Sequence, residues 1–154
     1  MQEQERKQKM KKVVINRSYG NFDKISLKGV KRLCELRDIS VYLFDDDFLN
    51  GKTTFIPLED DGVSEYFYAL DVPNPNDYEH DNEFYMDHMV QWCLTDNRED
   101  IHLIQMVEEL GKDASMRDGD FVIVEIPDDV KYEIVCEHGE GPEVIHEKHR
   151  TWEK

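Results

Sequence analysis

The sequence predicts a single domain of the α+β class, with a mixed or antiparallel sheet, two or three helices and a C-terminal β-hairpin. Strand-like and helix-like apolar spacings both occur, but without the regular strand–helix–strand alternation of a parallel α/β fold. The 154 residues are 39% hydrophobic and 10% aromatic, which is enough for one buried core. We expect this domain to span residues 12–152 and to follow a flexible basic tail at residues 1–11.

The first predicted elements are a strand and a helix. Residues 13–15 are the apolar run Val-Val-Ile, and the turn-forming residues 18–21 follow them. Ser26 is a candidate N-cap because a helix-like apolar spacing begins directly after it. The apolar side of that helix would consist of Leu27, Val30, Leu33 and Cys34.

Three further strands are expected before the middle of the chain. Residues 39–44 alternate between apolar and polar side chains, and we expect the three aspartates at 45–47 to end that strand. Residues 53–57 and 65–70 are rich in β-branched and aromatic side chains, which favours two more strands. The two prolines that follow indicate a loop.

The pattern of apolar residues in the second half of the sequence predicts two helices and three strands. Residues 84–94 carry apolar side chains at helical spacing, and a second helix is expected between Asn97 and Gly111. The apolar stripe of that second helix would consist of Ile101, Ile104, Val107 and Leu110. Strands are expected at residues 121–126, 130–135 and 144–146, and the glycine-rich turn before the last one predicts a hairpin.

Charge is distributed very unevenly along the chain. Residues 41–100 contain 16 acidic residues against Lys52 and Arg98, whereas the first 40 residues contain 11 basic and 5 acidic ones. A segment this acidic repels nucleic acid backbones and anionic membranes, and it attracts basic protein surfaces or cations. Direct binding of nucleic acid is therefore not expected.

The cysteines and the hydropathy indicate a cytoplasmic protein. Cys34, Cys93 and Cys136 are odd in number, widely spaced and without a CxxC pair, which is typical of reduced thiols. No apolar run approaches the ~18 residues of a membrane span. The charged N-terminal segment also lacks the apolar stretch of a secretion signal.

Three segments, in this order, carry a resemblance to a known family. They are VVINRSYG through Phe22, VEELG at residues 107–111, and VEIPDDV at residues 124–130 continued by EKHRTW at residues 147–152. Together they resemble an uncharacterised family of small phage and prophage proteins. The resemblance implies a phage-encoded protein in the cytoplasm of the bacterial host, and it implies no activity. Where this family tends to have a second glycine, Asn21 stands here, and the acidic residues 45–96 resemble an insertion.

Basic and aromatic side chains near the two ends of the chain are candidates for binding a small ligand. Arginine donates two parallel hydrogen bonds to a phosphate, and an aromatic ring stacks on any base. The candidates for a nucleotide site are Asn16, Arg17, Tyr19, Phe22, His149, Arg150 and Trp152. In the alternative interpretation, Phe22 and Trp152 close the core while Arg150 pairs with Asp128 or Asp129.

Neither a metal nor another cofactor is expected. Residues Cys136, His138, His146 and His149 are of the types that bind zinc, but their spacing matches no standard zinc module. The acidic clusters contain carboxylate oxygens that suit Ca²⁺ or Mg²⁺, but the twelve-residue calcium-loop pattern does not occur.

The acidic middle is the strongest candidate for binding a protein partner. Its acids alternate with aromatic residues, which are the usual anchors of protein interfaces. The candidate residues are Asp45, Asp46, Asp47, Asp60, Asp61, Tyr66, Tyr68 and Tyr85. A surface that mimics DNA and a merely solvated face are alternative interpretations.

No motif of an enzyme stands out. The serines lie in no G-x-S-x-G turn, and neither a P-loop nor a GxGxxG motif occurs. The working hypothesis is a protein that inhibits or redirects a basic host protein by binding it. The alternative is a protein that binds a nucleotide or a signalling molecule through the basic and aromatic residues near its ends. A hydrolase of such a molecule is a third class, which product formation would distinguish.

Overall fold

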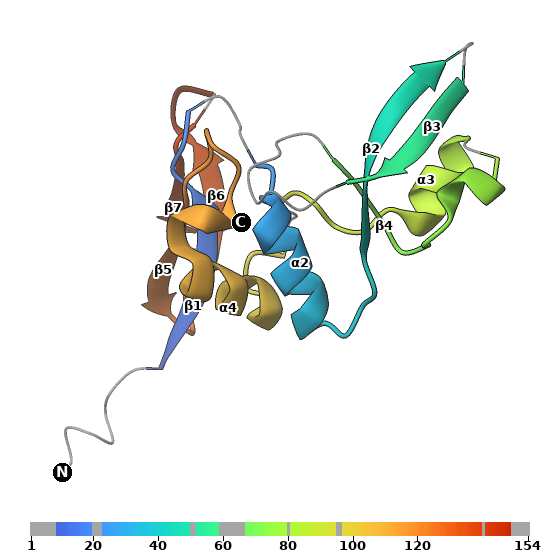
Figure 1. Cartoon of the computed structure of the whole chain (residues 1–154). Coiled ribbons are helices and arrows are strands. Elements are labelled where there is room, and N and C mark those ends of the chain that lie inside the picture. Colours follow the sequence, from blue (N-terminus) through green and yellow to red (C-terminus); the bar gives the residue numbers. More distant parts are fainter. Residues whose placement is uncertain are drawn as a thin grey trace, which may run out of the picture.

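The computed structural model describes residues 9–19, 23–49, 52–58, 67–79, 81–94, 97–139 and 141–148. Within these ranges, three helices and seven strands are arranged in two groups (Figure 1). All strand pairs are antiparallel, and they form three small sheets with the orders β1-β5, β3-β2-β4 and β6-β7. The predicted α+β class and the C-terminal hairpin are confirmed.

Strand β1 (Met10–Asn16) pairs with β5 (Phe121–Pro127), and Val13 lies opposite Val124. The apolar run at residues 13–15 is fully buried, as its sequence predicts. Met10 and Lys11, which were expected in the tail, are the first two residues of this strand because they pair with the end of β5.

Helix α2 (Leu27–Leu36) begins at the predicted cap, where the Ser26 hydroxyl accepts a hydrogen bond from the Gly29 amide at 3.0 Å. Its predicted apolar side is buried. Gly29 permits a close approach: a Cβ atom there would lie 2.8 Å from the carbonyl oxygen of Ala114. The helix therefore packs directly against the backbone that follows α4.

Helix α4 (Ile101–Leu110) begins four residues later than Asn97, the residue expected to open it. Asp100 is the actual cap, because its carboxylate accepts a hydrogen bond from the Leu103 amide at 2.9 Å. Ile101 is consequently the first helical residue, and its side chain is 73% exposed instead of lying on the apolar stripe. Gly111 ends the helix as predicted, with φ at +56°.

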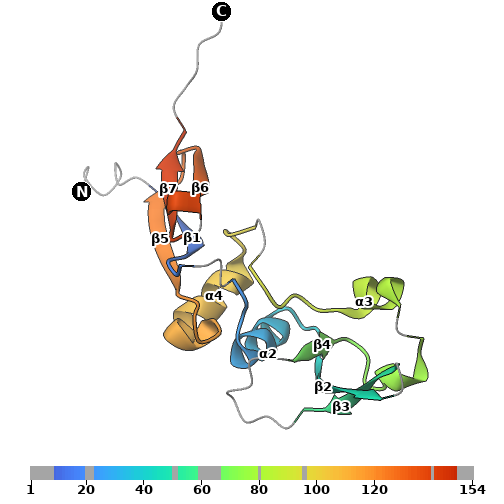
Figure 2. The ribbon, with the colours of Figure 1, turned by 90° about the horizontal axis from the view of Figure 1, so that it is seen from above.

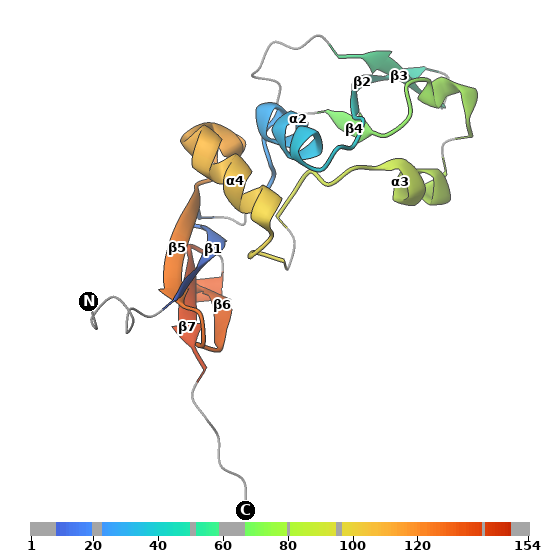
Figure 3. The same ribbon diagram turned by 90° about the horizontal axis from the view of Figure 1, so that it is seen from below.

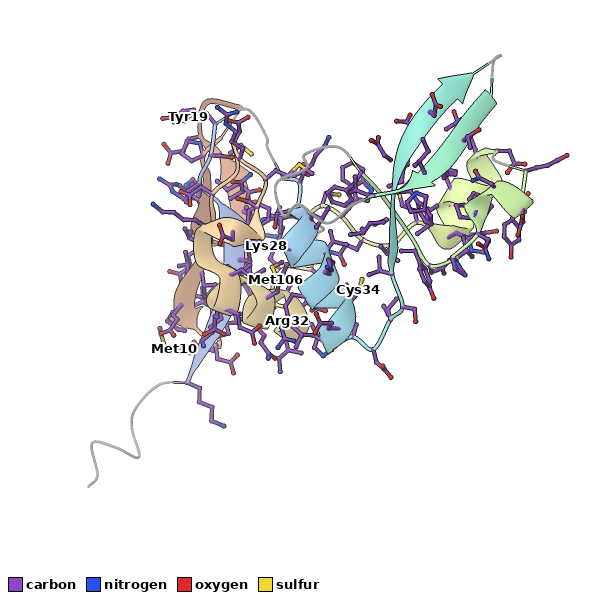
Figure 4. All side chains as sticks on the ribbon, viewed as in Figure 1. Met10, Tyr19, Lys28, Arg32, Cys34 and Met106 are labelled. Atoms are coloured by element: carbon purple, nitrogen blue, oxygen red, sulfur yellow. The ribbon has the colours of Figure 1, made fainter. Side chains whose placement is uncertain are left out.

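The main hydrophobic core lies between α2, α4 and the β1–β5 sheet. It contains Val14, Val30, Leu33, Met106 and Val107, all buried. At the surface, where α2 and α4 meet, the Arg32 guanidinium donates two hydrogen bonds to the Glu109 carboxylate, at 2.5 and 3.0 Å. Figure 4 labels Arg32 and Met106 in this region between the two helices.

The second group of elements is named the acidic lobe here. It consists of β2 (Tyr42–Leu49), β3 (Lys52–Pro57), β4 (Tyr68–Leu70) and α3 (Asn82–His88). Figures 2 and 3 show this lobe at one end of the molecule and β1, β5, β6 and β7 at the other, with α2 and α4 between them.

The expectation that the three aspartates at 45–47 end a strand is wrong. Asp45, Asp46 and Asp47 lie inside β2, opposite Ile56, Phe55 and Thr54 of β3. Their low strand propensity is outweighed because β3 supplies the backbone hydrogen bonds of a hairpin. The strand also begins later than predicted, at Tyr42.

The expectation of one helix over residues 84–94 is also corrected. Helix α3 ends at His88, and the chain continues in an extended conformation. There the Val90 amide donates to the Ala69 carbonyl at 2.9 Å, and the Ile25 amide donates to the Trp92 carbonyl at 2.8 Å. Pairing with distant segments on both sides therefore overrides the helical spacing.

The acidic lobe has a small core of its own, formed by Phe44, Phe55, Leu70 and Phe84. Strand β4 connects the two cores, because Ala69 packs in the main core while the next residue, Leu70, packs in the core of the lobe. Successive side chains of a strand point to opposite faces, so three residues are sufficient for this connection.

The C-terminal hairpin consists of β6 (Tyr132–Cys136) and β7 (Glu143–Glu147), with Ile134 opposite Ile145. Both strands lie within two residues of their predicted bounds. The hairpin is not paired in a sheet with β5, although only the turn after Pro127 separates them in the sequence. It contacts the end of β1, where the Asn16 amide and the Arg17 guanidinium donate hydrogen bonds to Glu143.

Candidate functional site

Asn16 and Arg17, two of the predicted ligand-binding residues, are held by contacts within the protein. Asn16 is only 3% exposed, and its side-chain oxygen accepts hydrogen bonds from the Ser18 amide, the Ser18 hydroxyl and the Asp120 amide, at 2.8–3.1 Å. The Arg17 guanidinium donates to the Glu143 carbonyl at 2.6 Å. Both side chains therefore fix the end of β1 to its neighbours.

An ion pair that the sequence analysis did not identify lies beside them. The Arg98 guanidinium donates two hydrogen bonds to the Glu143 carboxylate, at 2.8 and 3.0 Å. The same carboxylate accepts the Asn16 amide at 2.6 Å, and Arg98 also donates to the Val14 carbonyl at 3.3 Å. The two ionic side chains are 12% and 15% exposed, so this pair joins β7, β1 and the loop before α4.

Of the remaining predicted ligand-binding residues, the structure describes Tyr19 alone. Tyr19 is described and is 69% exposed, at the end of the first sheet opposite Met10 (Figure 4). Phe22, His149, Arg150 and Trp152 lie outside the described residues. Among the described residues of the predicted nucleotide site, Asn16 and Arg17 therefore contact other parts of the protein, and Tyr19 offers an exposed ring.

A groove of about 920 Å³ runs along the hairpin near these residues. Basic and acidic side chains alternate in its wall, and several of them bind each other. The Tyr132 hydroxyl donates to the Glu99 carboxylate at 2.7 Å, and the Lys11 ammonium lies 5.0 Å from the centre of the Tyr132 ring. Mixed charge of this kind provides no concentrated positive potential for an anion.

The hydroxyl of Tyr132 provides a pH-dependent prediction. Burial, the hydrogen bond to Glu99 and the charge of Glu99 raise its pKa from 10 to about 12. A raised pKa means that the folded state holds the proton more tightly, so this contribution to stability is complete below pH 10 and is lost as the pH rises towards 12. In a titration of absorbance at 295 nm, the Tyr132→Phe variant should lack the component near pH 12. Tyr19→Phe should retain that component, and its loss there would contradict the assignment.

The residues of zinc-binding type do not form a site in the part of the chain that the structure describes. In the hairpin, Cys136 lies opposite Glu143, whereas His146 lies opposite Glu133, three pairs away. At about 3.3 Å per residue this separates the two side chains by roughly 10 Å. Among the described residues, no group of three or more His, Cys, Asp or Glu side chains is arranged to hold a metal ion. His149 and the side chain of His138 lie outside the description.

The predicted partner-binding acids lie on the surface of the acidic lobe. Asp45, Asp46 and Asp47 are exposed, and no lysine or arginine side chain that the structure describes is within ion-pairing distance of them. Asp60, Asp61 and Tyr66 lie outside the described residues. Further exposed acids on the described part of the lobe are Asp71, Asp77, Glu79, Asp81, Glu83 and Asp87.

The two predicted tyrosines connect this acidic surface to the core of the lobe. The rings of Tyr68 and Tyr85 pack edge-on against Phe55, with centroids 5.1 and 6.1 Å away. The Tyr68 hydroxyl donates a long hydrogen bond, 3.4 Å, to the Asp46 carboxylate. Burial first, and then the charge of Asp46, raises the pKa of both phenols. At neutral pH, both phenols therefore keep their protons and add no charge to this surface.

The cysteines are arranged as structural residues. Cys34 is buried in the main core, and burial raises the pKa of its thiol. Burial and the charge of Asp23 raise the pKa of Cys93 as well. A raised pKa keeps a thiol protonated and so poorly nucleophilic, which argues against either residue as a catalytic nucleophile.

Comparison with known proteins found no family model, no curated protein and no solved structure that matches this chain. Within the described residues, every helix is too short or too polar to cross a lipid bilayer. The description of the site thus depends on the chemistry of the chain's own residues.

Proposed function

We propose that this protein acts by binding another protein, and that the acidic lobe contacts a basic surface of that partner. The observation that carries the proposal is the set of exposed carboxylates of the acidic lobe: among the described residues, only Asp71 has a basic partner, the His88 ring at 2.9 Å. Between residues 41 and 94 the chain has 13 acidic residues, and Lys52 is the only lysine or arginine. Like charges held this close repel each other, and a basic partner relieves that repulsion while it accelerates association.

The resemblance of the chain to small phage proteins extends the proposal. On that basis the proposed partner is a protein of a bacterial host, met in the cytoplasm and inhibited or redirected by the complex. The half-buried rings of Tyr68 and Tyr85 support a protein partner, because aromatic side chains beside a charged rim are typical of interface anchors.

The test is a quantitative capture experiment with a bacterial lysate. The immobilised protein should retain a basic protein at low salt and release it as the salt concentration rises. Neutralising three exposed acids of the lobe, in the variant Asp47→Asn, Asp77→Asn and Asp87→Asn, should lower the captured amount about tenfold. That is a loss of about 1.4 kcal/mol, or roughly 0.5 kcal/mol for each screened charge.

The matched control removes three exposed acidic charges from β5, from the turn after it and from β7, at the other end of the molecule: Glu125→Gln, Asp128→Asn and Glu147→Gln. Its net charge equals that of the lobe variant. Equal losses in the two variants would mean that net charge alone drives capture, and the acidic lobe would then not be the binding surface.

A further inference from the structure

A cavity of about 390 Å³ lies where the acidic lobe meets the segment that precedes α2. Asp45 and Asp46 of β2 line one side of it, together with Phe67 and Tyr68 at the start of β4. Lys24 and Trp92 line it from the other elements. Its volume falls within the range of about 300–1,000 Å³ that is typical of ligand pockets.

The acidic side of the cavity is preorganised. The Asp46 amide donates to the Asp45 carboxylate at 2.8 Å, and the Asp46 carboxylate accepts the Tyr68 hydroxyl. The residues that line the cavity include two acids, Asp45 and Asp46, and one base, Lys24, so their formal charges sum to −1. A cation that enters this cavity would meet acceptors that are already oriented.

The aromatic side shows an affinity for cations within the protein itself. The Lys24 ammonium lies over the Trp92 ring, 5.2 Å from its centroid, which is within the range of a cation–π interaction. The Trp92 indole N–H donates to the Met89 sulfur at 3.0 Å, and this contact fixes the plane of the ring. Phe67 and Tyr68 add further aromatic surface to the lining.

We propose that this cavity binds the guanidinium group of an arginine side chain, and that in the complex the arginine belongs to the basic partner. The second half of this inference rests on the proposed function. Arginine fits better than lysine because its planar group stacks on aromatic rings and donates two hydrogen bonds to a carboxylate. Its weaker hydration also lowers the cost of entering a half-enclosed, aromatic cavity.

The experiment is an NMR titration of the ¹⁵N-labelled full chain with Nα-acetyl-arginine amide. The chain has two tryptophans, so a Trp152→Phe variant assigns the indole signal of Trp92. That signal should shift and saturate with the arginine probe. Nα-acetyl-citrulline amide, which has the same shape without the charge, should cause no saturating shift. The lysine derivative should bind several-fold more weakly.

Two variants locate the binding. Asp46→Asn keeps the shape of the side chain but removes its charge, and it should weaken binding of the arginine probe about tenfold. Asp128→Asn, an equal charge change at the other end of the molecule, should leave the affinity unchanged. Equal binding of citrulline, equal or tighter binding of lysine, or unchanged affinity in Asp46→Asn would each overturn the arginine assignment.

The arginine titration and the lysate capture experiment can fail independently of each other. If capture depends on Asp47, Asp77 and Asp87 but the arginine probe does not bind, the inference about the cavity is wrong and the proposed function stands. If the probe binds near Trp92 but capture is unaffected by those three acids, the cavity still binds arginine and the proposed binding surface is wrong.

Discussion

Replacing Glu143 with alanine is expected to lower the free energy of unfolding by about 3 kcal/mol. The substitution removes both hydrogen bonds that the Glu143 carboxylate accepts from Arg98, and it removes the acceptor of the Asn16 amide. All of these groups are largely buried, so water replaces the lost contacts poorly. Equilibrium unfolding in urea, followed by circular dichroism, measures the change.

Two further variants separate the ion pair from the strand that carries it. Glu143→Gln keeps an acceptor for the Asn16 amide, and it should lose only about 1–2 kcal/mol. Glu147→Ala changes an exposed residue at the end of the same strand and should cost less than about 0.5 kcal/mol. Similar losses for Glu143→Ala and Glu147→Ala would show that the ion pair adds nothing to stability.

The second large effect is expected for Phe55→Ala, at about 3–5 kcal/mol. Phe55 is 2% exposed and lies at the centre of the small core, where its ring contacts Phe44, Tyr68 and Tyr85. Its removal leaves a cavity at the centre of a small core, whose other buried residues are Phe44, Leu70 and Phe84. Hydrogen exchange should therefore accelerate first in the acidic lobe.

The distribution of that loss tests how the two cores are coupled. Amides of α2 and α4 should keep most of their protection in Phe55→Ala, since the main core contains none of the affected rings. Ile56→Ala, at the neighbouring 44% exposed position of the same strand, is the control and should cost far less. Uniform loss of protection over both cores would contradict a separately stabilised lobe.

The elements that could be predicted from the sequence are those with local signals. Ser26 caps α2, Gly111 ends α4 at a positive φ, and the turn before β7 forms a hairpin. Each of these depends on residues within a few positions of one another, so the sequence was sufficient. The α+β class follows from the same local signals, since strand and helix spacings alternate irregularly.

The errors occur where pairing between two segments outweighs the propensity of the residues themselves. Asp45–47 stay in a strand because β3 lies beside them, and the helix at residues 82–88 stops because the chain after it pairs with β4 and with residue 25. The partners of the chain after α3 cannot be identified from the local sequence, whereas the pair Asn50-Gly51 between residues 49 and 52 is a local hairpin signal that could have predicted the pairing of residues 45–47. Tertiary hydrogen bonding in these places outweighs propensity, which differs between residue types by only about 1 kcal/mol.

For the candidate sites, the side-chain chemistry can be predicted from the sequence, whereas the contacts in which that chemistry is used depend on the fold. The acidic character of the middle and the candidates Asp45, Asp46 and Tyr68 follow from composition alone. Only the fold places Lys24 and Trp92 around the same cavity. Only the fold, likewise, commits Asn16 and Arg17 to contacts with the hairpin instead of a ligand. Each residue type carries its own chemistry wherever it stands. Residues far apart in the sequence, such as Asn16 and Glu143, come together only through packing.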